Sequence, residues 1–144
     1  MIHPAQKLKI LKGKFSIYIQ KSKFNLQLLY DGSVVKEYKI AIGKDEETPT
    51  GKFTIETTEK NPTWYMTDKK TGKKEAIKYG DPRNILGDRW MGFNKPNSSY
   101  GIHGTTDDAS IGTRASSGCI RMHNNDVIEL YEIIPSGADV TIKD

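Results

Sequence analysis

A run of alternating apolar and polar residues at positions 24–43 constrains the fold of this 144-residue chain more than any other feature. Its apolar side chains recur at every second position in two blocks: Phe24, Leu26, Leu28 and Tyr30, then Tyr38, Ile40 and Ile42. A period of two predicts strands with one buried face. Between the blocks, Gly32 of Asp-Gly-Ser accepts positive φ without steric cost. The stretch therefore predicts a β-hairpin.

Two further strands and one helix are predicted after this hairpin. A turn at Pro49 and Gly51 leads into a strand with Phe53 and Ile55 on one face. Near the C-terminus, apolar residues follow helical spacing: Val127, Leu130, Tyr131 and Ile134. The N-cap of this helix is expected at Asn124 or Asn125, and Pro135 and Gly137 end it. A last short strand is predicted at 138–144.

The segment 61–97 is rich in Gly, Pro, Asn, Lys and Trp and has little periodicity. Its Asp-Lys-Lys-Thr-Gly-Lys-Lys portion predicts an exposed loop or a hairpin tip. Long irregular segments in small domains more often form lids or binding walls than idle loops. We therefore expect this segment to form one wall of a cleft, with Trp90 and nearby Tyr100 as candidate ligand contacts.

Length and composition predict one domain spanning 1–144. The fold class indicated is mainly β: a single-domain β-sandwich of mixed sheets with one short α-helix near the C-terminus. Residues 1–20 are expected to form an N-terminal strand or tail. Apolar residues make up 35% of the chain, and no run approaches the roughly 20 needed to span a bilayer. The net charge of +4 comes without a basic cluster interleaved with aromatics, which argues against nucleic-acid binding.

The only cysteine lies in a stretch of small residues, Ser116-Ser117-Gly118-Cys119. Gly118 permits a tight turn, and such a turn aims backbone N–H groups at one point, as an oxyanion site requires. Arg121 falls on the same side of an extended segment as Cys119, where its charge favours the reactive thiolate. His103 precedes the cysteine by a separation that suits a return to a neighbouring strand. Together these residues form a candidate Cys–His pair in which imidazole accepts the thiol proton.

Two other interpretations of these residues stay open. A lone cysteine is often an inert small hydrophobe, although Cys119 lies in a polar, glycine-flanked stretch; composition and spacing leave inertness and catalysis equally open. His103, Cys119 and His123 also supply three side chains of the types that bind zinc. The segment between Cys119 and His123 lacks a helical pattern, so the metal site is the weaker alternative.

Several ordered blocks of the chain resemble the catalytic domain of YkuD-type L,D-transpeptidases. The signature blocks are "IHGT" at 102–105, "IG" at 111–112 and "SSGCIRM" at 116–122. Upstream, similar blocks are "YDGSVVKEYKIAIGKDEETPTGKFTI", "NPTW" and "GDPRNILGDRWMGF", and downstream the likeness continues through "HNNDVIELYEIIP". The resemblance covers residues 24–143, nearly the whole chain.

The resemblance implies roles for the site residues. Cys119 is implied to be the nucleophile and His103 its base, with the Gly104 carbonyl holding the imidazole in place. Backbone N–H groups around Gly118 and Cys119 are implied to stabilise the oxyanion. The residues implied to shape the site are Arg121, Ser116 and Ser117. Many family members carry His where this chain has Ser117, a difference that bears on substrate contacts more than on the nucleophile.

The resemblance also implies a substrate, the stem peptide of bacterial peptidoglycan. Cys119 would attack the carbonyl of the third stem residue, expel the terminal D-alanine and retain a thioester. The third-residue amine of another stem would resolve the thioester into a cross-link, and water would give carboxypeptidase activity. No metal or organic cofactor is implied, and carbapenems are implied covalent inhibitors.

The family resemblance places the protein in the cell wall, the periplasm or another extracytoplasmic site. The first 20 residues show no uninterrupted apolar stretch typical of a signal peptide, and they are too few for a complete LysM repeat. Two alternative functions remain. A sortase-like cysteine transpeptidase also pairs Cys, His and Arg, but usually with the Arg further from the Cys. A non-catalytic cell-wall-binding module is disfavoured because His103, Cys119 and Arg121 are all intact.

Overall fold

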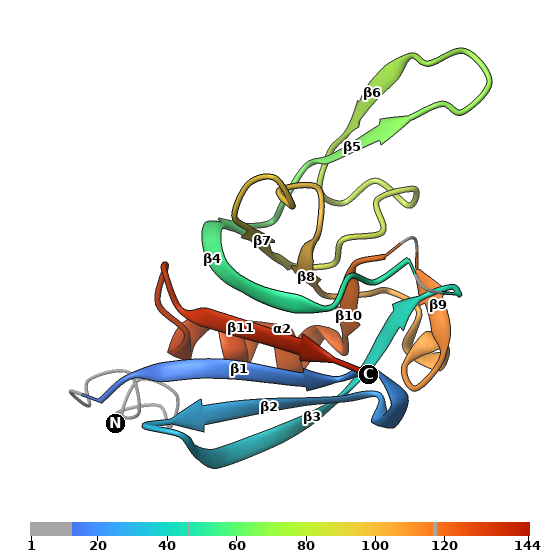
Figure 1. Ribbon diagram of the computed structural model, residues 1–144. Coiled ribbons are helices and arrows are strands. Elements are labelled where there is room, and N and C mark those ends of the chain that lie inside the picture. Colours follow the sequence, from blue (N-terminus) through green and yellow to red (C-terminus); the bar gives the residue numbers. More distant parts are fainter. Residues whose placement is uncertain (1–12, 46, 117) are drawn as a thin grey trace.

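The protein is described by a computed structural model that covers residues 13–45, 47–116 and 118–144 (Figure 1). The predicted tail at 1–20 lies mostly outside the described residues, and Ser117 lies outside them as well. The strands are β1 Phe15–Gln20, β2 Asn25–Tyr30, β3 Ser33–Gly43, β4 Gly51–Lys60, β5 Trp64–Thr67, β6 Lys74–Ile77, β7 Arg89–Phe93, β8 Gly101–His103, β9 Arg114–Ser116, β10 Ile120–Met122 and β11 Asp139–Lys143. The helical elements are the short 3₁₀ turns η1 Lys21–Lys23 and η2 Asp108–Ser110 and the α-helix α2 Asn124–Ile133.

Nine strands of the described residues form one sheet, in the order β10-β8-β7-β4-β11-β1-β2-β3-β9. β10 also pairs with β3, so the sheet closes on itself. Strand directions are mixed, because β1–β11, β8–β10 and β3–β9 are parallel and the other pairs are antiparallel. The mainly β class is confirmed. The β-sandwich is wrong in detail, since a sandwich packs two separate sheets and here a strand pair joins the two sides.

The hairpin predicted from alternation is confirmed in β2 and β3, which pair antiparallel. Asp31 and Gly32 both have positive φ, 48° and 83°, as a two-residue turn matching the twist of the strands requires. The predicted inward side chains that are fully buried are Leu26, Leu28, Ile40 and Ile42. Phe24 departs from the pattern, because it adopts the left-handed conformation at the end of η1 and the strand begins one residue later.

The core lies between the closed sheet and α2, which packs against β7 and β8. The helix is confirmed where predicted, with Val127, Leu130 and Ile133 buried. The predicted N-cap is wrong: His123 occupies that position without a side-chain cap, and the Asn124 side chain binds Asp88 instead. In the part of the chain that the structure describes, no helix has the length and apolar character needed to cross a bilayer.

The segment 61–97 is more regular than its sequence predicts. β5 and β6 form a two-stranded hairpin that projects away from the body of the protein (Figure 1), with the predicted hairpin tip at its end. β7 is a strand of the main sheet between β4 and β8. The sequence does not reveal β7, because it has five residues, Gly92 interrupts it and both Met91 and Phe93 are buried around that glycine.

Core packing predicts different costs for two truncations within the β2–β3 hairpin. Leu28→Ala removes a fully buried side chain and should lower the free energy of unfolding by about 2–5 kcal/mol. Val34→Ala is the matched control, since Val34 is 51% exposed, and its change should stay within about 0.5 kcal/mol. Urea denaturation measures both. Equal losses of stability in the two variants would contradict the assigned core.

Candidate active site

The site is built where β8 and β10 lie side by side as parallel strands. Arg121 of β10 is in register with His103 of β8, and Cys119 directly precedes β10. The chain between the two strands passes through η2 and β9 before it returns. The predicted strand-to-strand return is therefore confirmed. It brings together residues that are far apart in the sequence.

His103 is held in one tautomer. Its Nδ1 lies 2.5 Å from the Gly104 carbonyl oxygen, and because a carbonyl only accepts, Nδ1 carries the proton and Nε2 presents a lone pair. The imidazole is 2% exposed and lies against the Trp90 indole, with ring centroids 6.1 Å apart. Burial lowers the pKa of His103 to about 4; the Gly104 hydrogen bond opposes this, and the Arg121 charge adds to it. The imidazole is thus neutral at neutral pH.

Gly104 is itself fixed by a close contact that sequence reasoning missed. A Cβ on Gly104 would lie 2.3 Å from Asn124 Oδ1, so only glycine fits beside this amide. Asn124 Oδ1 accepts from the Asp88 backbone N–H at 2.9 Å, and its Nδ2 donates to the Asp88 carboxylate at 2.6 Å. Asn124 therefore joins the start of α2 to the loop before β7, and it does so in contact with Gly104, whose carbonyl orients His103.

The turn before Cys119 is organised by Ser116. The Ser116 hydroxyl accepts from Gly118 N–H at 3.2 Å and donates to the Cys119 carbonyl at 2.7 Å. Gly118 has φ of 126°, and a Cβ there would lie 2.5 Å from the Tyr100 ring. Both the positive φ and the close approach of the Tyr100 ring require glycine at position 118, as predicted.

The Cys119 thiol is partly buried and lies 3.7 Å from the Ser99 carbonyl oxygen, a weak S–H contact. Burial raises the pKa of Cys119 above its ordinary value, because the thiolate loses hydration there. The Gly101 backbone amide and the Arg121 charge lower the pKa, but their effect is smaller. The predicted influence of the Arg121 charge therefore has the right sign, and the effect of burial on the pKa of Cys119 exceeds it.

Arg121 lies at the inner end of the site. One of its terminal nitrogens donates to the Ser110 hydroxyl at 3.1 Å. Its Nε is buried and has no hydrogen-bond partner among the described residues. A buried donor without a partner carries a desolvation cost, so this nitrogen is a destabilising feature of the site.

A cleft of about 650 Å³ opens over these residues, a volume that admits a peptide-sized ligand. The floor includes the four predicted site residues His103, Ser116, Cys119 and Arg121. Residues of the segment 61–100 also line the cleft, and they include Trp64, Leu86, Trp90 and Tyr100. The expected contribution of 61–97 to a cleft wall is confirmed, and both Trp90 and Tyr100 line it.

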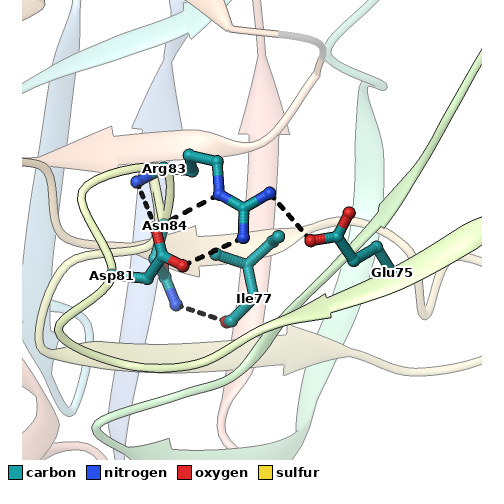
Figure 2. A network of polar contacts seen from close by, with 5 residues as sticks. All are labelled: Glu75, Ile77, Asp81, Arg83 and Asn84. Atoms are coloured by element: carbon teal, nitrogen blue, oxygen red, sulfur yellow. Dashed lines mark hydrogen bonds and ion pairs between the residues drawn. The ribbon is translucent and has the colours of Figure 1, made fainter.

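The projecting hairpin that forms part of this wall is anchored at its base (Figure 2). Asn84, which is buried, donates to the carbonyls of Pro62 and Ile77 at either end of the hairpin, at 3.0 and 2.9 Å. Arg83 also pairs with Glu75 of β6 at 2.8 Å (Figure 2). An exposed ion pair contributes little, so the buried amide is the stronger anchor.

The zinc alternative finds no support in the described residues. No group of three His, Cys, Asp or Glu side chains gathers there as a metal site would require. His123 instead lies with its Nδ1 2.8 Å from the Asp108 carboxylate. It contacts η2 and is absent from the lining of the Cys119 cleft.

Comparison with known families assigns the chain. Residues 14–142 match the YkuD family, described as the L,D-transpeptidase catalytic domain. The chain therefore belongs to this family. Among curated relatives it is 38% identical to the Bacillus subtilis protein YqjB over 138 residues, which is 93% of this chain and 74% of YqjB. It is 43% identical to B. subtilis YkuD over 118 residues, 81% of this chain and 58% of that relative. Both relatives are named as L,D-transpeptidases.

Solved structures share the fold. An L,D-transpeptidase from Mycobacterium smegmatis superposes with a TM-score of 0.72 at 16% identity, over 92% of this chain and 59% of that one. L,D-transpeptidase 3 from Mycobacterium tuberculosis, in complex with a faropenem-derived adduct, gives 0.72 at 14% identity, over 92% and 61%. The chain thus spans about three fifths of these structures.

The charge state of Cys119 predicts its alkylation profile. As Cys119 is the only thiol, the mass gained from iodoacetamide reports on this residue alone. Because the pKa is raised, the rate should rise with pH at a midpoint above the roughly 8.5 of a free thiol. Arg121→Gln should move the midpoint higher still. A wild-type midpoint below that of a free thiol would contradict the protonated resting state.

Proposed function

We propose that this protein is a peptidoglycan L,D-transpeptidase whose nucleophile is Cys119 and whose general base is His103. The observation that carries the proposal is the shared cleft, which is lined by both Cys119 and His103, the latter in the tautomer that leaves Nε2 unprotonated. Family membership supports the same reaction. The 1–144 chain is proposed to act as one catalytic domain.

The acylation half-reaction follows from the charge states. Cys119 Sγ attacks the carbonyl carbon of the third stem residue, and its proton passes to His103 Nε2. The carbonyl oxygen becomes an oxyanion, for which the Cys119 backbone N–H is the proposed donor, since Gly118 N–H donates to the Ser116 hydroxyl. The C–N bond to D-alanine then breaks, the imidazolium returns the proton to the leaving amine, and a thioester remains on Cys119.

The deacylation half-reaction uses the same groups. The neutral imidazole takes a proton from the third-residue amine of a second stem as that amine attacks the thioester carbon. The C–S bond breaks, the thiol is reprotonated and a cross-link is formed. Water in place of the amine releases the free acid instead, which is carboxypeptidase activity.

The low pKa of His103 affects the two proton transfers in opposite ways: the neutral imidazole is a weak base toward the thiol, and the imidazolium is a strong acid toward the departing amine. Both partners are neutral at rest, so attack and proton transfer occur together rather than from a preformed thiolate. The imidazolium formed during attack is buried and lies near Arg121, and both factors make it a strong acid. It therefore readily protonates the departing amine.

Partners and location belong to this proposal. The proposed partners are peptidoglycan stem peptides, with carbapenem-type β-lactams as covalent inhibitors of Cys119. The β-lactam adduct of the M. tuberculosis structure supports this at the level of fold. An extracytoplasmic site, in the cell wall or periplasm, follows from the proposed substrate. Membership in the YkuD family outweighs the sortase-like alternative, and a wall-binding module without activity is left to experiment.

Product analysis tests the proposed reaction. Stem tetrapeptides mixed with the protein should yield D-alanine with cross-linked dimer or tripeptide, and a carbapenem should add one adduct in an intact mass spectrum. Cys119→Ala should abolish all of these. Binding of the tetrapeptide without release of D-alanine would identify a non-catalytic wall-binding module, and an adduct on the Cys119→Ala variant would exclude Cys119 as the nucleophile.

The base assignment predicts a particular pH profile. Neutral His103 is required, so the rate of carbapenem acylation should stay level as the pH falls and decline only near the pKa of about 4. His103→Gln should slow acylation by about 10²–10⁴-fold while the circular dichroism spectrum is unchanged. Loss of the rate near pH 6.5, where an exposed histidine titrates, would refute the buried neutral base.

A further inference from the structure

Thr48, in the turn between β3 and β4, connects the end of β3 to the turn before Cys119. Its side chain is 1% exposed. Its hydroxyl accepts from the Gly43 backbone N–H at 2.6 Å and donates to the Gly118 carbonyl at 2.9 Å. Both bonds are buried, so water does not compete for them. The direction of the Gly118 carbonyl is thereby fixed by a residue remote in sequence.

Fixing that carbonyl also fixes the amide of the nucleophile. Gly118 C=O and Cys119 N–H belong to one peptide unit, and this peptide is trans. In a trans peptide the two groups point in opposite directions. A carbonyl held toward Thr48 therefore turns Cys119 N–H away from Thr48. Gly118 N–H is already bonded to the Ser116 hydroxyl, so of the two described residues Gly118 and Cys119 it is Cys119 whose N–H is left for an acyl oxygen.

The surrounding packing prevents this peptide from rotating. A Cβ on Gly43 would lie 2.8 Å from Gly118 Cα and 2.9 Å from the Thr48 nitrogen, so the three backbones are in direct contact. Thr48 is also anchored from its other side. Lys21, 1% exposed, donates from Nζ to the Thr48 carbonyl at 2.7 Å and joins the turn to η1.

We propose that Thr48 is a positioning residue for the oxyanion site: its hydroxyl sets the plane of the Gly118–Cys119 peptide and so aims Cys119 N–H at the developing oxyanion. The inference rests on the proposed acyl transfer at Cys119, but it concerns any acyl donor rather than the stem peptide in particular.

Two reactions of Cys119 separate this role from a general structural one. Acetylation by p-nitrophenyl acetate passes through an oxyanion: the thioester C–S bond forms, the ester C–O bond breaks and p-nitrophenolate leaves. Alkylation by iodoacetamide displaces iodide at a saturated carbon and forms no oxyanion. Intact mass spectrometry follows both reactions on the single thiol.

Thr48→Val keeps the shape of the side chain and removes the hydroxyl. It should slow acetylation by roughly 10–100-fold, up to the loss expected for one oxyanion donor, and leave alkylation unchanged. Thr48→Ser retains the hydroxyl and should restore acetylation. Unchanged acetylation in Thr48→Val, or an equal fall in both rates, would overturn the inference.

Stability and substrate are controlled separately. If Thr48→Val does not fold, Lys21→Met provides a second test, because it keeps the Thr48 hydroxyl and removes the donor to the Thr48 carbonyl. Lys21→Met should slow acetylation by a smaller factor and leave alkylation unchanged. An acetylation rate equal to that of the wild type would count against the inference. If the wild type is acetylated but releases no D-alanine from stem tetrapeptide, the proposed function fails. The positioning role is then still decided by the Thr48 variants.

Discussion

The whole site depends on β10, a strand of three residues that pairs with β8 on one side and with β3 on the other. The pairing with β3 closes the sheet, and the parallel pairing with β8 sets Arg121 beside His103. Cys119 immediately precedes this strand, so its position follows from the same hydrogen bonds. The fold and the candidate site are therefore not separable, because a shift of β10 would both open the sheet and move Cys119.

Burial sets the chemistry of the Cys–His pair more than charge does. It raises the pKa of Cys119 and lowers that of His103, so each effect favours the uncharged form. The Arg121 charge lowers the pKa of both residues, so it opposes the rise at Cys119 and adds to the fall at His103. The result is a neutral Cys–His pair. In the proposed reaction the thiol loses its proton only as it attacks an acyl group, so its activation is coupled to substrate.

Sequence patterns predicted the parts of the fold that are determined by residues close together in the chain. The alternation at 24–43 identified the β2–β3 hairpin, and Asp31-Gly32 identified its turn. The small residues around Gly118 and Cys119 predicted the tight turn, whereas the roles of Cys119 and His103 were predicted only by the family resemblance. Closure of the sheet was not predicted, because β10 has three residues and pairs with positions far away in the chain. The raised pKa of Cys119 depends on burial by distant segments, and the role of Asn124 depends on a loop that lies beside α2 only after folding.

The protonated resting state of Cys119 has a consequence for durability. Peroxides oxidise cysteines mainly through the thiolate, so a buried thiol that keeps its proton is a poor target. The chain also contains no second cysteine with which an oxidised Cys119 would form an internal disulfide as a reversible protected state. The same burial that keeps Cys119 protonated before it meets substrate in the proposed reaction therefore also limits its oxidation.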